Sequence, residues 1–109
     1  MTILELETKE GDGATHLILR GELDLSTVEK VEEELRRAEG AEPETVVLDL
    51  RELTFLDSTG LRTIVKADQR AKEAGKRFVV GKGPDTVHRV FTITRLDERL
   101  EMVDDPAGI

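Results

Sequence analysis

The chain has 109 residues, and 24 acidic against 16 basic side chains give it a net charge of −8 at pH 7. This length allows one small domain with a single core and leaves no room for a separate catalytic domain. The negative charge disfavours nucleic acid and anionic membranes as partners. Cysteine is absent, which excludes a disulfide framework, a thiolate metal site and a thiol nucleophile.

The beginning of the chain lacks the basic start and apolar stretch of a signal peptide, and no apolar run is long enough to cross a membrane. We therefore expect a soluble, cytoplasmic protein that uses no cofactor and no metal. Its expected partners are other proteins.

The first half of the chain predicts a hairpin, a helix and a buried strand. Residues 1–9 and 15–19 have strand-like apolar patterns, and Gly11-Asp12-Gly13 joins them as a turn. Residues 26–40 carry apolar side chains at helical spacing. Residues 45–50 are almost continuously apolar, which is typical of a central strand covered on both faces.

The second half predicts a helix, a strand, a turn and a short helix capped by Asp85, in residues 57–75, 77–80, 81–84 and from 85 onward. Residues 96–103 fit either a last strand or a helix. An ordered core of residues 3–103 would leave residues 104–109 as a flexible tail. Together the elements predict a single α/β domain over residues 1–109, with a mixed sheet of four to five strands and helices packed mainly on one face.

The most informative segment is Asp57-Ser58-Thr59-Gly60-Leu61, which follows the buried strand and begins a helix. Asp57 is a good N-cap, because its carboxylate can accept hydrogen bonds from free backbone N–H groups and suits the positive end of the helix dipole. By themselves, Asp57, Ser58 and Thr59 are explained by capping alone. Gly60 is not, because a glycine in the first turn costs about 0.5 to 1 kcal/mol relative to alanine. We interpret it as a place where another backbone or a ligand comes close.

Four segments resemble the anti-sigma factor antagonists, small proteins that consist of one STAS domain. They are Gly-Glu-Leu-Asp at 21–24, Val-Val-Leu-Asp-Leu at 46–50, Phe-Leu-Asp-Ser-Thr-Gly-Leu at 55–61 and Val-Phe-Thr-Ile-Thr at 90–94. Their order and spacing agree with the family over roughly residues 3 to 103. The resemblance implies a STAS-like fold and a protein that is not an enzyme.

The resemblance also implies a switch between partners. In the family, the unmodified antagonist binds an anti-sigma factor serine kinase and so releases a sigma factor. The kinase phosphorylates the antagonist, which then dissociates, and a phosphatase resets it. The phosphoacceptor maps to Ser58, with Thr59 as the second candidate. The residues expected to bind the partner are Asp24, Asp57, Ser58, Thr59, Gly60 and Arg62.

Two residues depart from the family's pattern. Arg62 and Arg95 stand where many relatives have glycine. Arg62 lies one turn into the predicted helix, beside the predicted contact face, so we expect it to affect which kinase fits.

Three other functions fit parts of the sequence. An enzyme would need a nucleophile with a base, or a metal cluster, but His16 and His88 each stand alone. A phosphoaspartate receiver could use Asp49 at a strand end, yet the acidic pair that receivers carry after their first strand is missing. The remaining alternative is a STAS module that acts as a scaffold or sensor partner in a stress-signalling complex.

Overall fold

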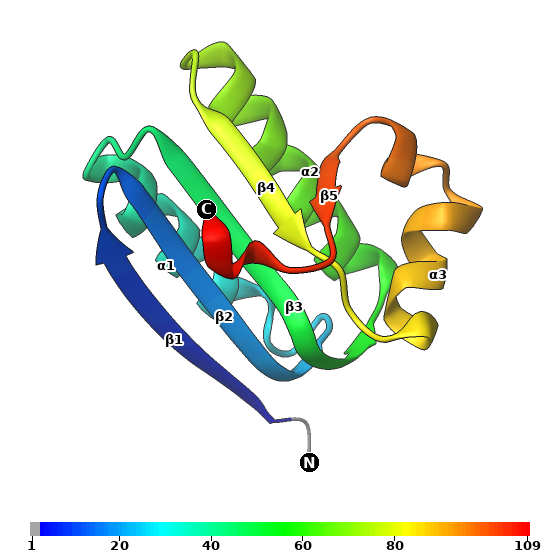
Figure 1. Cartoon of the computed structure of the whole chain (residues 1–109). Coiled ribbons are helices and arrows are strands. Elements are labelled where there is room, and N and C mark those ends of the chain that lie inside the picture. The colour runs from blue at the N-terminus through cyan, green and yellow to red at the C-terminus, as the bar shows by residue number, and fades with distance from the viewer. Residues whose placement is uncertain (1–2) are drawn as a thin grey trace.

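A mixed five-stranded sheet forms the centre of the molecule, with its strands in the order β1-β2-β3-β4-β5 (Figure 1). The structure, a computed structural model, describes residues 3–109, so the first two residues of the first predicted strand lie outside the described part. β1 and β2 form an antiparallel hairpin, whereas β2 to β5 run parallel to one another. In chain order the strands span Leu4–Gly11, Ala14–Leu23, Thr45–Leu56, Arg77–Gly81 and Glu101–Val103.

Three helices provide the connections between the parallel strands. α1 (Val28–Gly40) and α2 (Ser58–Glu73) pack on one face of the sheet, and α3 (Asp85–Ile93) contacts β3 (Figure 1). Parallel strands need such crossovers, because a tight turn joins only antiparallel strands. The predicted α/β fold, a mixed sheet with helices mainly on one face, is confirmed.

The hairpin between β1 and β2 turns through two residues, Asp12 and Gly13. Their φ angles are +48° and +80°. Two successive positive φ angles are typical of the type I′ turn, whose twist matches that of the flanking strands. The predicted turn is therefore confirmed.

Apolar side chains from the sheet and the helices form one core. Its most completely buried members come from β2, β3, β4 and all three helices: Leu17, Leu19, Leu23, Val31, Leu35, Leu48, Leu50, Leu53, Ile64, Val80 and Phe91. Burying a side chain of this size contributes about 1.5 to 3 kcal/mol. This core fixes the start of α2 against the ends of β2 and β3.

Several element boundaries differ from the predictions. β2 continues to Leu23, beyond the predicted end at residue 19. β3 continues to Leu56 instead of ending at Leu50. The prediction ended too early because the second half of the strand pairs only with β2 and lacks the continuous apolar pattern of the first half. Pro84 is the N-cap of α3, and Asp85 is the first helical residue, so the predicted cap is wrong by one position. Residues 96–103 contain both a 3-10 turn and the short strand β5.

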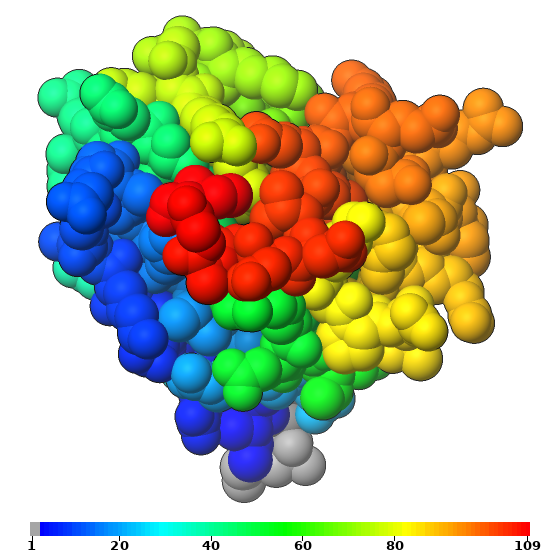
Figure 2. Space-filling view, in the orientation of Figure 1, coloured from blue at the N-terminus to red at the C-terminus, as the bar shows by residue number. Residues whose placement is uncertain are grey.

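Residues 104–109 fold back over the sheet face that α1 and α2 leave open, in contrast to the flexible tail that the sequence suggested (Figures 1 and 2). Pro106 is buried in a 3-10 turn, Pro106–Gly108. It packs on Gly81, where a Cβ atom would lie 2.9 Å from the proline Cγ. Val47 and Val79 alternate with residues of the helix-side core and are fully buried on this other face.

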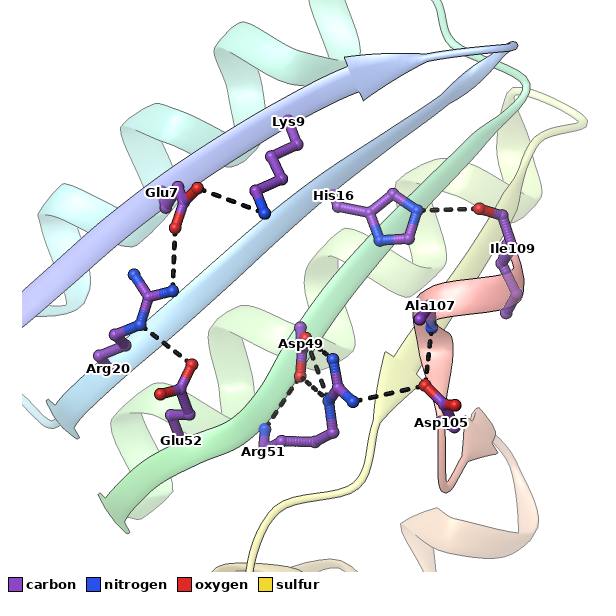
Figure 3. A network of polar contacts seen from close by, with 10 residues as sticks. All are labelled: Glu7, Lys9, His16, Arg20, Asp49, Arg51, Glu52, Asp105, Ala107 and Ile109. Atoms are coloured by element: carbon purple, nitrogen blue, oxygen red, sulfur yellow. Dashed lines mark hydrogen bonds and ion pairs between the residues drawn. The ribbon is translucent and has the colours of Figure 1, made fainter.

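A polar network fastens this C-terminal segment to the sheet (Figure 3). Arg51 Nη2 donates to Asp49 Oδ2 at 2.9 Å, and Arg51 Nη1 lies 3.4 Å from Asp105 Oδ1. His16 Nε2 lies 3.0 Å from the carbonyl oxygen of Ile109. Burial by itself would raise the pKa of Asp49, but hydrogen bonds from the side chain and backbone N–H of Arg51 outweigh it and lower that pKa below its usual value.

Candidate functional site

The predicted site lies where the parallel strands β2 and β3 end (Figure 1). Leu23 and Leu56, the last residues of these strands, are partners in the sheet. The backbone N–H of Asp57 then donates to the carbonyl oxygen of Leu23 at 3.2 Å. The loop after β2 and the start of α2 are thereby held side by side.

Asp57 joins these two segments through its side chain as well. It is the N-cap of α2, and its Oδ1 accepts a hydrogen bond from the Gly60 N–H at 2.9 Å, which confirms the predicted cap. Its Oδ2 accepts from the N–H of Leu25 at 3.2 Å. None of the ion pairs found within residues 3–109 involves Asp57. Its carboxylate is thus fixed by neutral backbone donors.

The predicted phosphoacceptor, Ser58, is the first residue of α2 and is exposed to solvent. Thr59 is half-buried, and Arg62 is exposed one turn further along the helix. Backbone N–H groups in the first turn have no partner within the helix, and the helix dipole makes this end positive. The Ser58 hydroxyl is therefore accessible at a site that favours negative charge.

Gly60 is buried, and the structure gives it a different reason from the expected one. A Cβ atom at this position would lie 2.6 Å from Leu23 Cγ and 2.8 Å from Leu56 Cδ1. The glycine therefore lets two core side chains approach the helix. Its contribution to the site is to seat α2 on the strand ends.

Asp24 organises the loop between β2 and α1. Its Oδ1 accepts hydrogen bonds from the Ser26 N–H at 2.9 Å and from the Ser26 hydroxyl at 2.7 Å. Thr27, the N-cap of α1, donates through its hydroxyl to the carbonyl oxygen of Glu22 at 2.9 Å. The structure thus brings Asp24 and Asp57, two of the predicted partner-binding residues, to the same shallow hollow.

Two apolar side chains in this hollow were not predicted as site residues. Leu25 is 74% exposed and Phe55 is 46% exposed, and both line the hollow with Asp24, Ser26 and Asp57. Exposed apolar side chains surrounded by polar ones mark surfaces that bind other proteins. In the sequence, Leu25 stands between two polar turn residues, where an apolar side chain has no core to join. That pattern could have identified it.

The enzyme and receiver interpretations gain no support from the geometry. Asp49 bonds to the N–H of Arg51 at 3.0 Å, as expected for a structural carboxylate. His88 stacks on Phe91, and His16 contacts the C-terminal segment. Within residues 3–109, no three acidic or histidine side chains gather as a metal site would need, and no helix is long and apolar enough to span a bilayer.

Arg95 directly follows the C-cap of α3 and has a φ angle of +61°. This left-handed conformation is the one that glycine adopts most readily at helix ends. The backbone at Arg95 therefore has the conformation that the glycine expected from the family pattern would adopt, although the residue is arginine.

Comparison with known proteins finds relatives of almost the whole chain. Residues 6–104 match the family model described as Mlab, STAS domain. The chain is also 31% identical over 100 residues to the anti-sigma-B factor antagonist of Listeria monocytogenes, and this alignment covers 91% of the chain and 88% of the relative.

Solved structures share the same architecture. The crystal structure of an anti-sigma factor antagonist from Mycobacterium paratuberculosis matches with a TM-score of 0.84 at 22% identity, over 97% of this chain and 90% of that one. The phosphorylated form of the Bacillus cell fate determinant SpoIIAA matches with a TM-score of 0.73 at 18% identity, over 95% of this chain and 96% of that one. At such identities the likeness is one of fold.

Proposed function

Since the chain belongs to the STAS domain family, we propose that it is a cytoplasmic anti-sigma factor antagonist. Its unphosphorylated form binds an anti-sigma factor serine kinase, and this binding releases a sigma factor. Phosphorylation of Ser58 by the kinase ends the complex, and a phosphatase restores the unphosphorylated form. The anti-sigma-B factor antagonist among its relatives supports the general role.

The observation that carries the proposal is the exposed Ser58 hydroxyl at the start of a firmly anchored helix. Ser58 Oγ attacks the γ-phosphorus of ATP held by the kinase, the bond between that phosphorus and ADP breaks, and a base of the kinase accepts the hydroxyl proton. The hydrogen bonds of Asp57 and the packing at Gly60 hold the acceptor in one position. Such preorganisation lowers the entropic cost of docking.

The hollow beside Ser58 supplies the contact surface for the partner. Leu25 and Phe55 offer apolar area, and Asp24 and Asp57 add negative charge around it. The N–H of Leu25 donates to Asp57 and that of Ser26 to Asp24, so the backbone around Leu25 is held in place although its side chain is exposed. We therefore assign to the kinase a complementary surface with an apolar depression and basic side chains at its rim.

Phosphorylation changes the complex more than it changes the fold. The phosphate adds about −1.5 to −2 charges beside Asp57. Because a helix N-terminus accommodates a phosphate, the free domain stays folded. Against a packed or acidic partner surface, the same charge costs on the order of 2 to 4 kcal/mol, which weakens binding roughly 30- to 1000-fold.

The proposal is tested by incubating the protein with ATP and candidate anti-sigma kinases and locating the phosphate by mass spectrometry. We expect it on Ser58, with no incorporation in Ser58→Ala and normal incorporation in Thr59→Ala. Binding of Ser58→Asp should be at least about 30-fold weaker than that of the wild type. Failure of every candidate kinase to bind and modify the protein would favour the scaffold role in a stress-signalling complex.

A further inference from the structure

We propose that Arg62 binds the phosphate of phosphorylated Ser58 within the same helix, and that this ion pair sets the strength of the switch. The regulatory part rests on the proposed function, whereas the ion pair itself depends only on the phosphate.

The geometry of α2 places the two side chains together. Ser58 and Arg62 are four residues apart in one uninterrupted helix, and both are exposed. At this spacing the Cβ atoms lie about 5 to 6 Å apart on the same face. Helical side chains also lean toward the N-terminus, so the guanidinium of Arg62 can reach the turn that contains Ser58.

Arg62 forms no ion pair with another residue in the described part of the chain. Arg20, Arg51, Arg70 and Arg77, by contrast, all pair with carboxylates of this chain. Its neighbours three and four residues away on the helix are Ser58, Thr59, Val65 and Lys66, none of which is acidic. A phosphate on Ser58 would place an anion at one of these neighbouring positions.

The charge balance explains what the pair does. Asp57 precedes Ser58 and repels a phosphate, whereas Arg62 attracts it and matches two of its oxygens with a planar fork of N–H donors. Because Arg62 offsets part of the added charge of about −2, the phosphate and Arg62 together present a net charge of about −1 to the partner. Arg62 therefore reduces the loss of partner affinity that phosphorylation causes. Without Arg62, the affinities of the unphosphorylated and phosphorylated forms differ more.

The ion pair can be measured without any kinase, by installing phosphoserine at position 58 through an amber codon. Phosphorus-31 NMR then reports the second pKa of the phosphate, which is ordinarily about 6. We expect this pKa to be about 0.3 to 0.7 unit lower in the wild-type background than in Arg62→Gln, as an exposed ion pair predicts. Arg62→Lys should retain part of the difference.

Lys66→Gln is the matched control, because Lys66 is an exposed cation on the same helix. It lies about 12 Å from Ser58 along the helix axis, beyond the screening length of about 10 Å at 0.1 M salt. It should leave the phosphate pKa unchanged. Equal pKa values in wild type and Arg62→Gln, or an equal effect of Lys66→Gln, would overturn the ion pair. Circular dichroism of each unphosphorylated variant checks the fold.

The regulatory part is tested with a kinase that binds the wild-type protein. The ratio of its affinities for the unphosphorylated and the phosphoserine forms should be about 3- to 5-fold larger in Arg62→Gln than in the wild type. An unchanged ratio would refute the regulatory role while the proposed function stands. Absence of any binding kinase would refute both the function and that role, but the NMR result would be unaffected.

Discussion

Asp49 within β3 and Asp57 directly after it are both fixed by hydrogen bonds, but their surroundings differ. Asp49 is 4% exposed and pairs with Arg51 beside the C-terminal segment, so its charge is neutralised inside the chain. Asp57 is half-buried and bonds two backbone N–H groups, so its charge stays available at the surface. A carboxylate with an internal cation stabilises the fold, whereas one held by neutral donors can act on a partner.

The largest expected effect concerns the support beneath Asp57. Gly60→Ala places a methyl group against Leu23 and Leu56, and should lower the free energy of unfolding by about 2 to 3 kcal/mol despite the better helix propensity of alanine. Urea unfolding measures this change. Gly40→Ala is the control, since a Cβ atom there meets nothing within 4 Å, and it should stabilise α1. Equal effects of the two variants would contradict the packing role.

Asp49→Asn tests the neutralised carboxylate. We expect a loss of about 1 to 2 kcal/mol at pH 7, because the amide keeps some hydrogen bonds but loses the ion pair with Arg51. The folded-state pKa of Asp49 is lowered, so its stabilisation is complete above the usual Asp pKa of about 3.9 and is lost as the pH falls through the folded-state value. Unfolding of Asp49→Asn should therefore depend less on pH in this acidic range.

Asp57→Asn makes the same chemical change at the other carboxylate. It should affect binding of the kinase more than it affects the stability of the fold. Asparagine caps helices about as well as aspartate, so stability should change by less than about 0.5 kcal/mol. The rate of association with the kinase should instead fall several-fold at low salt, because a surface charge has been removed. A stability loss as large as that of Asp49→Asn would erase the distinction between the two carboxylates.

The smallest expected effect lies outside both regions. Arg95→Gly should raise the free energy of unfolding by about 0.5 kcal/mol, because glycine relieves the left-handed strain at the end of α3 but is more flexible when unfolded. Thermal unfolding at pH 7 measures it. The Asp49→Asn and Arg95→Gly effects should add, since independent sites couple little.

The sequence predicted features that depend on neighbouring residues. The Asp57 cap, the turn at Asp12 and Gly13 and the helical faces all follow from local chemistry or periodicity. The bond from the Leu25 N–H to Asp57 joins residues far apart in the chain, and only the pairing of β2 with β3 brings them together. The reason for Gly60 also depends on that pairing.

The C-terminal segment could not be predicted for a similar reason. Its polar, proline-containing composition is typical of a frayed end, yet Pro106 fits over Gly81 and Asp105 meets Arg51. Such a fit depends on the shape of a completed sheet face. Val47 and Val79 form this face and alternate with residues that face the helices. Any central strand covered on both faces has the same apolar pattern, so the pattern does not reveal what covers the face.

The position of Ile109 also matters for how the protein is handled. Its carbonyl oxygen lies 3.0 Å from His16 Nε2 on β2, and Ile109 is half-buried against the sheet (Figure 3). A fluorescent protein or affinity tag fused there would emerge from a sheet face and crowd the contacts of Arg51 and Asp105. Fusions at the other end of the chain would leave these contacts alone.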